Sequence, residues 1–145
     1  MAGIVVGIDG SDESRAALSW ALEEARLRKA SVRVVYAWRD PYVPAPGFGL
    51  PEDFDFDTLR TAAEEFLRGF VAESVDGESD VTIEEVTAEG SASSVLVEAA
   101  EGADLLVVGS RGHGGFTGLL LGSVSQQCAH YATCPVVIVR GPRMA

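Results

Sequence analysis

The chain has 145 residues, 47% of them hydrophobic, and a formal net charge of −11. This length suits one domain with a single core, and the hydrophobic content excludes intrinsic disorder. The acidic charge argues against a nucleic-acid partner, because non-specific DNA or RNA binding needs a basic surface. No apolar run approaches the roughly 18 residues of a membrane span, and the N-terminus lacks the basic flank of a signal peptide, so we expect a cytoplasmic protein with no membrane partner.

Short apolar runs alternate with amphipathic segments. Strands are expected over residues 3–8, 32–38, 81–86, 104–109 and 135–139, which are rich in β-branched residues. Three of these runs are continuous, as in strands covered on both faces, whereas VTIEEV alternates and is typical of an edge strand. Helices are expected over residues 12–29, 57–75, 91–101 and 123–131. This alternation predicts one Rossmann-like α/β domain over residues 1–145, with a parallel sheet and right-handed crossovers.

Three segments add detail to this outline. The apolar face of the first helix is expected to hold Ala17, Leu18, Ala21, Leu22, Ala25 and Leu27. Residues 39–56 carry four prolines and two glycines, so a long loop should follow the second strand. Residues 73–104 contain ten acids and no base, which favours a solvated face.

The two cysteines, Cys128 and Cys134, flank AHYAT without any Cys or His spacing typical of a metal site. We therefore expect no protein-borne metal centre. The two side chains are interpreted as buried or inert thiols in a reducing compartment.

Two loops follow strands and precede helices, and each could hold an anion at the carboxyl edge of a parallel sheet. The first, Asp9-Gly10-Ser11, leads into a helix that begins with Asp12 and Glu13, so its positive dipole end is already satisfied by carboxylates that would repel a triphosphate. The second, GSRGHGGFTGLLLGS at 109–123, leads into a helix start without any acid.

The fourth helix begins Gly122-Ser123-Val124-Ser125, and Ser123 with Gln126 predicts a capping box. The hydroxyls of Ser123 and Ser125 are expected to be additional donors to an anion. In the loop before it, glycines 109, 112, 114 and 115 are expected to approach a ligand closely and to adopt positive φ. Arg111 either donates to the anion or is simply solvated, and a glycine-rich turn without any ligand is the alternative for the whole loop.

Other nucleotide and catalytic motifs are missing. The chain has no GxxxxGK[ST], no GxGxxG after the first strand and no GxSxG, which argues against a phosphate-loop NTPase, a dinucleotide site and an α/β-hydrolase. His113 precedes Gly114-Gly115-Phe116 and forms no HxGH motif, so we interpret it as a loop contact and assign no catalytic residue.

The pattern Gly109-x2-Gly112-x9-Gly122-Ser123 resembles the G-x2-G-x9-G-[ST] signature of the ATP-binding branch of the universal stress protein family. The segments IDGS, ADLLVVGSRG, LGSVSQQ and CPVVIVR resemble that family in the same order, so the resemblance spans nearly the whole chain. It implies an open five-stranded parallel sheet of order 3-2-1-4-5 with helices on both faces. It also implies a homodimer through the strand that begins at Pro135 and ends at Val139; the alternative is an edge strand of unspecified pairing.

The resemblance further implies roles for individual residues in binding ATP. Gly7 and Asp9 would line the adenosine end, and Ala37 would contact adenine through its backbone. Residues 109–115 would surround ribose and phosphates. The start of the fourth helix would hold the β- and γ-phosphates, and Mg²⁺ would be bridged by the phosphates. Asp9 has an alternative role as a pre-cap residue before the first helix. The expected set is Gly7, Asp9, Ala37, Gly109, Ser110, Arg111, Gly112, His113, Gly114, Gly115, Gly122, Ser123, Val124 and Ser125.

Three functions are compatible with these residues. The favoured one is an ATP-binding stress-response protein in which the nucleotide is a ligand or a very slow substrate. The second is a slow ATPase or adenylyl-transfer enzyme, against which stands the lack of a nucleophile with an adjacent base and of a lysine near the phosphates. The third is an interaction protein that has lost nucleotide binding, against which stands the intact signature.

Overall fold

The computed structural model describes residues 3–38, 56–75, 80–111 and 121–141. Strands and helices alternate along it as expected. The elements are β1 (Ile4–Ile8), α1 (Asp12–Arg28), β2 (Val32–Trp38), α2 (Phe56–Ser74), β3 (Ile83–Glu89), α3 (Ala92–Ala99), β4 (Leu105–Gly109), α4 (Ser123–Tyr131) and β5 (Val136–Val139). The third strand is shifted from the expected 81–86 to 83–89, because β3 pairs with β2 along the full length of the latter, to Trp38 and Glu89.

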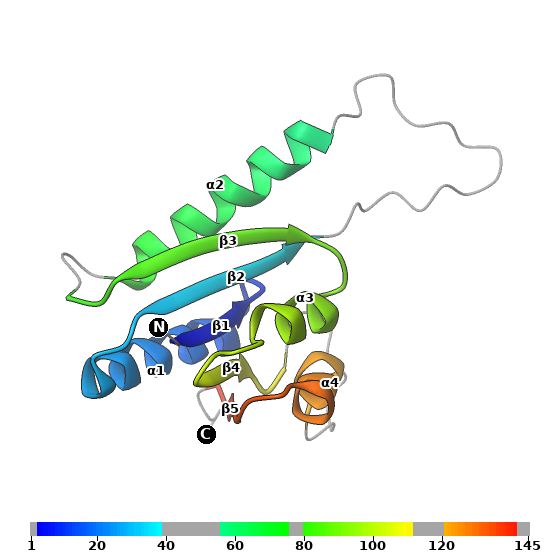
Figure 1. Ribbon diagram of the computed structural model, residues 1–145. Coiled ribbons are helices and arrows are strands. Elements are labelled where there is room, and N and C mark those ends of the chain that lie inside the picture. The colour runs from blue at the N-terminus through cyan, green and yellow to red at the C-terminus, as the bar shows by residue number, and fades with distance from the viewer. Residues whose placement is uncertain (1–2, 39–55, 76–79, 112–120, 142–145) are drawn as a thin grey trace.

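The five strands form one parallel sheet in the order β3-β2-β1-β4-β5, which confirms the expected topology. Helices α1 and α2 cover one face, and α3 and α4 cover the other (Figure 1). The alternating strand, β3, is an edge strand as expected, and β5 is the opposite edge. This doubly wound arrangement buries the central strands from both sides.

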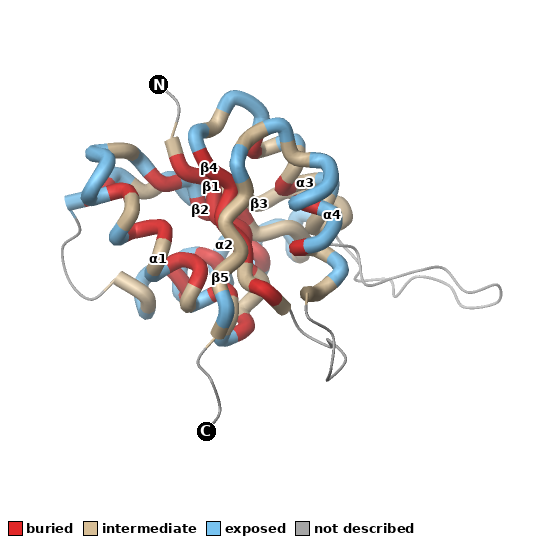
Figure 2. The backbone as a smooth tube through the Cα atoms, turned by 90° about the horizontal axis from the view of Figure 1, so that it is seen from below, coloured by how far each residue is buried: buried red, intermediate tan, exposed pale blue. Residues whose placement is uncertain are grey.

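Each face of the sheet has its own core, because successive side chains of a strand point to opposite faces. Val6 packs with Leu18 and Leu67 under α1 and α2, whereas its neighbour Val5 packs with Leu96 under α3. All five residues of β1 are buried. Figure 2 shows the buried central strands lying between the two layers of helices.

Helix α1 is specified by its ends and by its small apolar residues. Ser11 is the N-cap and accepts a hydrogen bond from the Ser14 N–H, and Lys29 closes the helix in the left-handed conformation at φ 57°. Every residue expected on the apolar face is buried except Leu27, which is 81% exposed. Leu27 is two residues after the fully buried Ala25, about 200° around the helix from it, so it points away from the sheet. The expectation for Leu27 was therefore wrong.

The acidic region is a solvated face, as expected, within the part of the chain that the structure describes. Every described acid from 73 to 104 is exposed. Three of them form surface ion pairs, Glu73 with Arg15 at 3.2 Å, Asp80 with Arg26 at 3.0 Å and Glu84 with Arg33 at 3.0 Å. The arginine lowers the pKa of Asp80 through its hydrogen bond. The long loop expected over residues 39–56 lies outside the described residues, apart from Phe56, which begins α2.

Candidate functional site at the carboxyl edge of the sheet

The carboxyl ends of β1 and β4 are the natural position for a ligand in this fold. The chain leaves β1 toward β2 and β3 on one side and returns to β4 on the other, so the strand order reverses between β1 and β4. The ladder between these strands ends at Val6 and Val107. Strand β1 nevertheless stays paired with β2 as far as Ile8, and β4 with β5 as far as Gly109. The two central strands are thus unpaired with each other over their last residues.

The loop after β1 is organised by hydrogen bonds within itself. Asp9 Oδ1 accepts from the Ser11 N–H at 2.9 Å, and Ser11 Oγ accepts from the Ser14 N–H at 3.2 Å. Gly10 between them adopts φ 89°, a conformation that favours glycine. Asp9 therefore has the pre-cap role considered above as an alternative, because it binds the N–H of Ser11, the N-cap of α1. One of its oxygens is engaged there, and its role toward adenosine stays a prediction.

Two of the predicted site glycines are required by packing. A Cβ on Gly7 would lie 2.5 Å from Leu96 Cδ1, and a Cβ on Gly109 would lie 2.8 Å from Glu13 Cβ. The described glycines with positive φ are Gly10, Gly90 and Gly102, so the expectation of positive φ at Gly109 was wrong. Gly109 ends β4 beneath the first turn of α1, and a side chain at this position would displace that turn.

The signature has two described arms, residues 109–111 after β4 and residues 121–125 at the start of α4. Hydrogen bonds join these arms at Ser110, Gly122 and Ser125, which we call the neck. The Ser110 carbonyl accepts from the Gly122 N–H at 2.6 Å and from Ser125 Oγ at 3.1 Å. The Ser110 N–H donates to the Val139 carbonyl at 2.8 Å, which holds the neck on the end of β5. The end of β4 and the start of α4 are therefore held together at this point.

Ser125 has a different role from the one its hydroxyl suggested. It is 1% exposed, and Oγ also donates to the Gly122 carbonyl at 3.0 Å. Its single hydroxyl proton is shared between two backbone carbonyls, so the expectation of an additional donor to an anion is not met by this side chain. The prediction that Ser125 contacts a phosphate therefore applies to its backbone N–H, which lies in the first turn of α4.

Helix α4 starts without any side-chain cap. Gly122 is the N-cap, with φ −75° and ψ 167°, and it makes no side-chain cap hydrogen bond. The capping box of Ser123 and Gln126 was therefore wrong: Gln126 Nε2 donates to the Leu121 carbonyl at 3.1 Å, and Ser123 is an exposed first-turn residue. The first turn has no acid, as expected, so nothing in it opposes an anion at the positive end of the helix dipole.

The carboxyl end of β2 contributes Ala37, which is half-buried and pairs with Ala88 of β3. Its neighbours are aromatic and contact α2: the ring centroids of Tyr36 and Phe66 are 4.8 Å apart, and those of Trp38 and Phe56 are 6.2 Å apart. Sequence reasoning did not single out these contacts. The signal was present in the YAW at the strand end, where alternation places both aromatic side chains on the face opposite Ala37.

The remaining expected residues divide into two groups. Arg111 and Val124 are described and half-buried, one following β4 and the other in the first turn of α4. Gly112, His113, Gly114 and Gly115 lie outside the described residues, so their expected contacts with ribose and phosphates stay predictions.

Neither cysteine offers a reactive thiolate at neutral pH. Cys128 is 0% exposed, and its burial raises the pKa of the thiol to about 11; burial also raises the pKa of Cys134. Both are free thiols, and the expectation of inert side chains is confirmed. Over the described residues, no group of three His, Cys, Asp or Glu side chains is placed to hold a metal ion.

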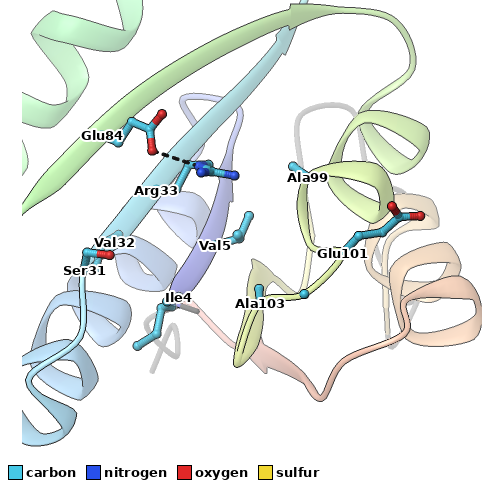
Figure 3. A pocket seen from close by; sticks show the side chains of 11 residues that line it. Ile4, Val5, Ser31, Val32, Arg33, Glu84, Ala99, Glu101 and Ala103 are labelled. Atoms are coloured by element: carbon cyan, nitrogen blue, oxygen red, sulfur yellow. Dashed lines mark hydrogen bonds and ion pairs between the residues drawn. The ribbon is translucent and has the colours of Figure 1, made fainter. Parts of the chain in front are cut away.

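A pocket of about 140 Å³ lies at the opposite edge of the sheet. It is lined by the starts of β1 and β2 and by the segment after α3, with the Arg33–Glu84 ion pair on one side and Glu101 across from it (Figure 3). Because the strands are parallel, this amino edge is remote from the neck and from the start of α4.

The open parallel sheet, its switch point between β1 and β4, and an acid-free helix start beside that point define a doubly wound α/β protein with a candidate anion site. The chain belongs to the universal stress protein family, whose model matches residues 2–140. It is 38% identical over 140 residues to "Universal stress protein Rv2005c" of Mycobacterium tuberculosis, covering 96% of this chain and 45% of that relative. The chain thus spans about half the length of the curated relatives it matches.

Solved structures share the fold over nearly the whole chain. The hypothetical protein MJ0577 superposes with a TM-score of 0.78 at 19% identity, covering 99% of each chain, which supports the fold alone. A universal stress protein in complex with cAMP superposes with a TM-score of 0.65 at 29% identity, covering 97% of this chain and 98% of that one. A universal stress protein from Archaeoglobus fulgidus in complex with dAMP has a TM-score of 0.62 at 24% identity, covering 96% and 98%.

Across the described residues, no helix has both the length and the apolar character that crossing a membrane requires.

Proposed function

We propose that this protein binds ATP, with Mg²⁺ bridged by the phosphates, at the carboxyl edge of the sheet, and that the nucleotide regulates its stress-response function. The observation that carries this proposal is the neck. It holds the two arms of the glycine signature together through the Ser110 carbonyl, next to a helix start that has no acid in its first turn. Backbone N–H groups at such a start are suited to phosphates.

The expected binding mode can be placed on these elements. The phosphates lie at the first turn of α4, near Ser123, with Arg111 as the closest cation of the signature. The adenosine end lies between the carboxyl ends of β1 and β2, near Asp9 and Ala37. Support for an adenine nucleotide comes from the 29%-identical universal stress protein that was solved with cAMP. Mg²⁺ is held by the phosphates in this proposal.

The nucleotide acts as a ligand or a very slow substrate. The described part of the edge supplies hydroxyls, backbone groups and the carboxylates of Asp9 and Glu13, and one oxygen of Asp9 already accepts from the Ser11 N–H. The two thiols are protonated at neutral pH because burial raises the pKa of both. Efficient hydrolysis or adenylyl transfer would need a positioned base or nucleophile. A slow ATPase is the second candidate, and a measured multiple-turnover rate of about 1 per second or more would favour it.

The protein acts in the cytoplasm as a homodimer through β5, and its net charge of −11 makes nucleic acid an unsuitable partner. Strand β5 is an edge of the sheet whose four residues are all half-buried, and a second copy would cover that edge. Sedimentation velocity at several protein concentrations tests the dimer. A monomer at all of them would contradict it.

The test of nucleotide binding begins with freshly purified protein, which is denatured so that any released nucleotide can be identified by chromatography and mass spectrometry. Protein freed of nucleotide is then titrated with Mg-ATP, cAMP and adenosine by calorimetry. We expect saturable binding of an adenine nucleotide and an increase in melting temperature. If no nucleotide is released, no heat is measured and the melting temperature does not change, the non-binding interaction protein replaces this proposal.

A further inference from the structure

The first turn of α1 lies against the same strand ends that form the candidate site. A Cβ on Gly109 would lie 2.9 Å from the carbonyl carbon of Glu13 and 3.0 Å from its oxygen. This close approach brings the backbone of Glu13 to the first glycine of the signature. The position of Glu13 relative to β4 is therefore fixed by packing.

The side chain of Glu13 continues from β4 to the end of β5. A Cβ on Gly141 would lie 3.0 Å from Glu13 Cγ and 3.1 Å from both Cδ and Oε1. Gly109 and Val139 are register partners, and Ser110 donates to Val139, so residues after β5 run beside the neck. The carboxylate of Glu13 consequently lies at the carboxyl edge next to Gly141, while its Cβ and backbone carbonyl lie next to Gly109.

Three acids lie at this start of α1, and they differ in environment. Asp12 is exposed, and Asp9 accepts a hydrogen bond from the Ser11 N–H. The atoms nearest to Gly109 and Gly141 all belong to Glu13, which is half-buried. A half-buried carboxylate is less screened by water and salt than an exposed one, so Glu13 acts more strongly on a charge bound nearby.

We propose that Glu13 is a specificity-determining residue that weakens the binding of metal-free polyphosphates and thereby makes ATP binding depend on a divalent cation. The inference rests on the proposed function. Its basis is the unequal charge of two helix starts at one edge: α1 carries Asp12 and Glu13 in its first turn, and α4 carries no acid there. Free ATP has about four negative charges and AMP about two, so repulsion by a fixed carboxylate rises with the number of phosphates. Mg²⁺ on the phosphates reduces that charge and relieves the repulsion.

The test compares wild-type protein with Glu13→Gln, which keeps the length and packing of the side chain and removes its charge. Dissociation constants are measured for ATP, AMP and cAMP, each with EDTA and with Mg²⁺. We expect Glu13→Gln to bind metal-free ATP about three- to tenfold more tightly than wild type, AMP less so, and cAMP or Mg-ATP within about twofold. Asp12→Asn is the matched control, because it removes the same charge from the same turn at an exposed position. It should change metal-free ATP binding by less than about twofold.

Circular dichroism and thermal melting check that each variant is folded, and Glu13→Met is the second uncharged variant if Gln at this position destabilises the helix start. If nucleotides bind but the ratio of metal-free ATP to cAMP affinity is the same in wild type and Glu13→Gln, or shifts equally in Asp12→Asn, the role of Glu13 is refuted while the proposed function stands. If neither wild type nor Glu13→Gln binds any nucleotide under either condition, both proposals are overturned.

Discussion

Replacement of Ser123 by Asp separates the stability of the fold from the binding of phosphates. Ser123 is the first residue of α4 and is exposed, and the first turn has no acid. A carboxylate there interacts favourably with the helix dipole, which stabilises the helix by about 0.3–1 kcal/mol. The same carboxylate occupies the place where the proposed binding mode puts the phosphates. The variant should therefore be as stable as wild type, or slightly more stable, and should bind ATP more weakly.

The size of the loss follows from the position of the side chain. Two unit charges about 4 Å apart repel by roughly 1 kcal/mol in water and roughly 4 kcal/mol near a protein surface. Because Ser123 is exposed, we expect a value in the lower half of this range. At about 1.4 kcal/mol per factor of ten, that is a loss of about five- to sixtyfold in affinity for Mg-ATP.

Calorimetric titration with Mg-ATP and with adenosine provides the measurement, and thermal melting without ligand checks the fold. Adenosine carries no phosphate, so its affinity should change by less than about twofold. Ser94→Asp is the matched control: Ser94 is an exposed residue in the first turn of α3, which also has no acid. An unchanged Mg-ATP affinity in folded Ser123→Asp would show that the phosphates bind elsewhere. An equal loss in Ser94→Asp would show only an effect of net charge.

Two further predictions concern packing and ionisation. Gly109→Ala should destabilise the protein by about 1–3 kcal/mol in urea unfolding, because the new Cβ would meet Glu13 Cβ at 2.8 Å and the backbone beside it. Gly69→Ala in α2, where nothing lies within 4 Å of the new Cβ, should instead be about 0.5–1 kcal/mol more stable, and similar effects of the two variants would contradict the packing argument. The pKa of Cys128 is raised from 9.0 to about 11 in the folded protein, so the unfolded thiol ionises first as pH rises. Its contribution to the free energy of unfolding should be constant below pH 9 and decrease between pH 9 and 11, and a Cys128→Ala variant with the same pH dependence as wild type would refute this.

Local patterns in the sequence were sufficient for the elements and for their order along the chain. Continuous β-branched runs and helical apolar faces indicated every strand and helix, and the alternating 81–86 segment indicated an edge strand. The strand order 3-2-1-4-5 came from resemblance to a family, since periodicity says nothing about which parallel strands are neighbours. The exposed Leu27 shows that an apolar residue type alone does not place a side chain in the core, since this position is about 200° around the helix from the buried Ala25.

The candidate site was also predicted only in part from local patterns in the sequence. Its charges were evident from the sequence: the acids at the start of α1 and their lack at the start of α4 both depend only on residue type. The capping box was also a local inference, and it failed because Gly122 occupies the N-cap and Ser123 lies one residue inside the helix. Which residue caps a helix depends on where the chain enters it, and here that point is held by the hydrogen bond from Gly122 to Ser110.

The sequence by itself therefore determined one α/β domain, its acidic character and the residues of the glycine signature. The tertiary structure alone decided what those residues do in the fold: Gly7 and Gly109 are small because Leu96 and the first turn of α1 approach them closely. It also decided that Ser125 closes the neck and that Glu13 lies along the ends of two strands. The physical reason is that these are contacts between residues far apart in the chain, brought together by the parallel topology, and no periodicity or spacing of neighbouring residues encodes them.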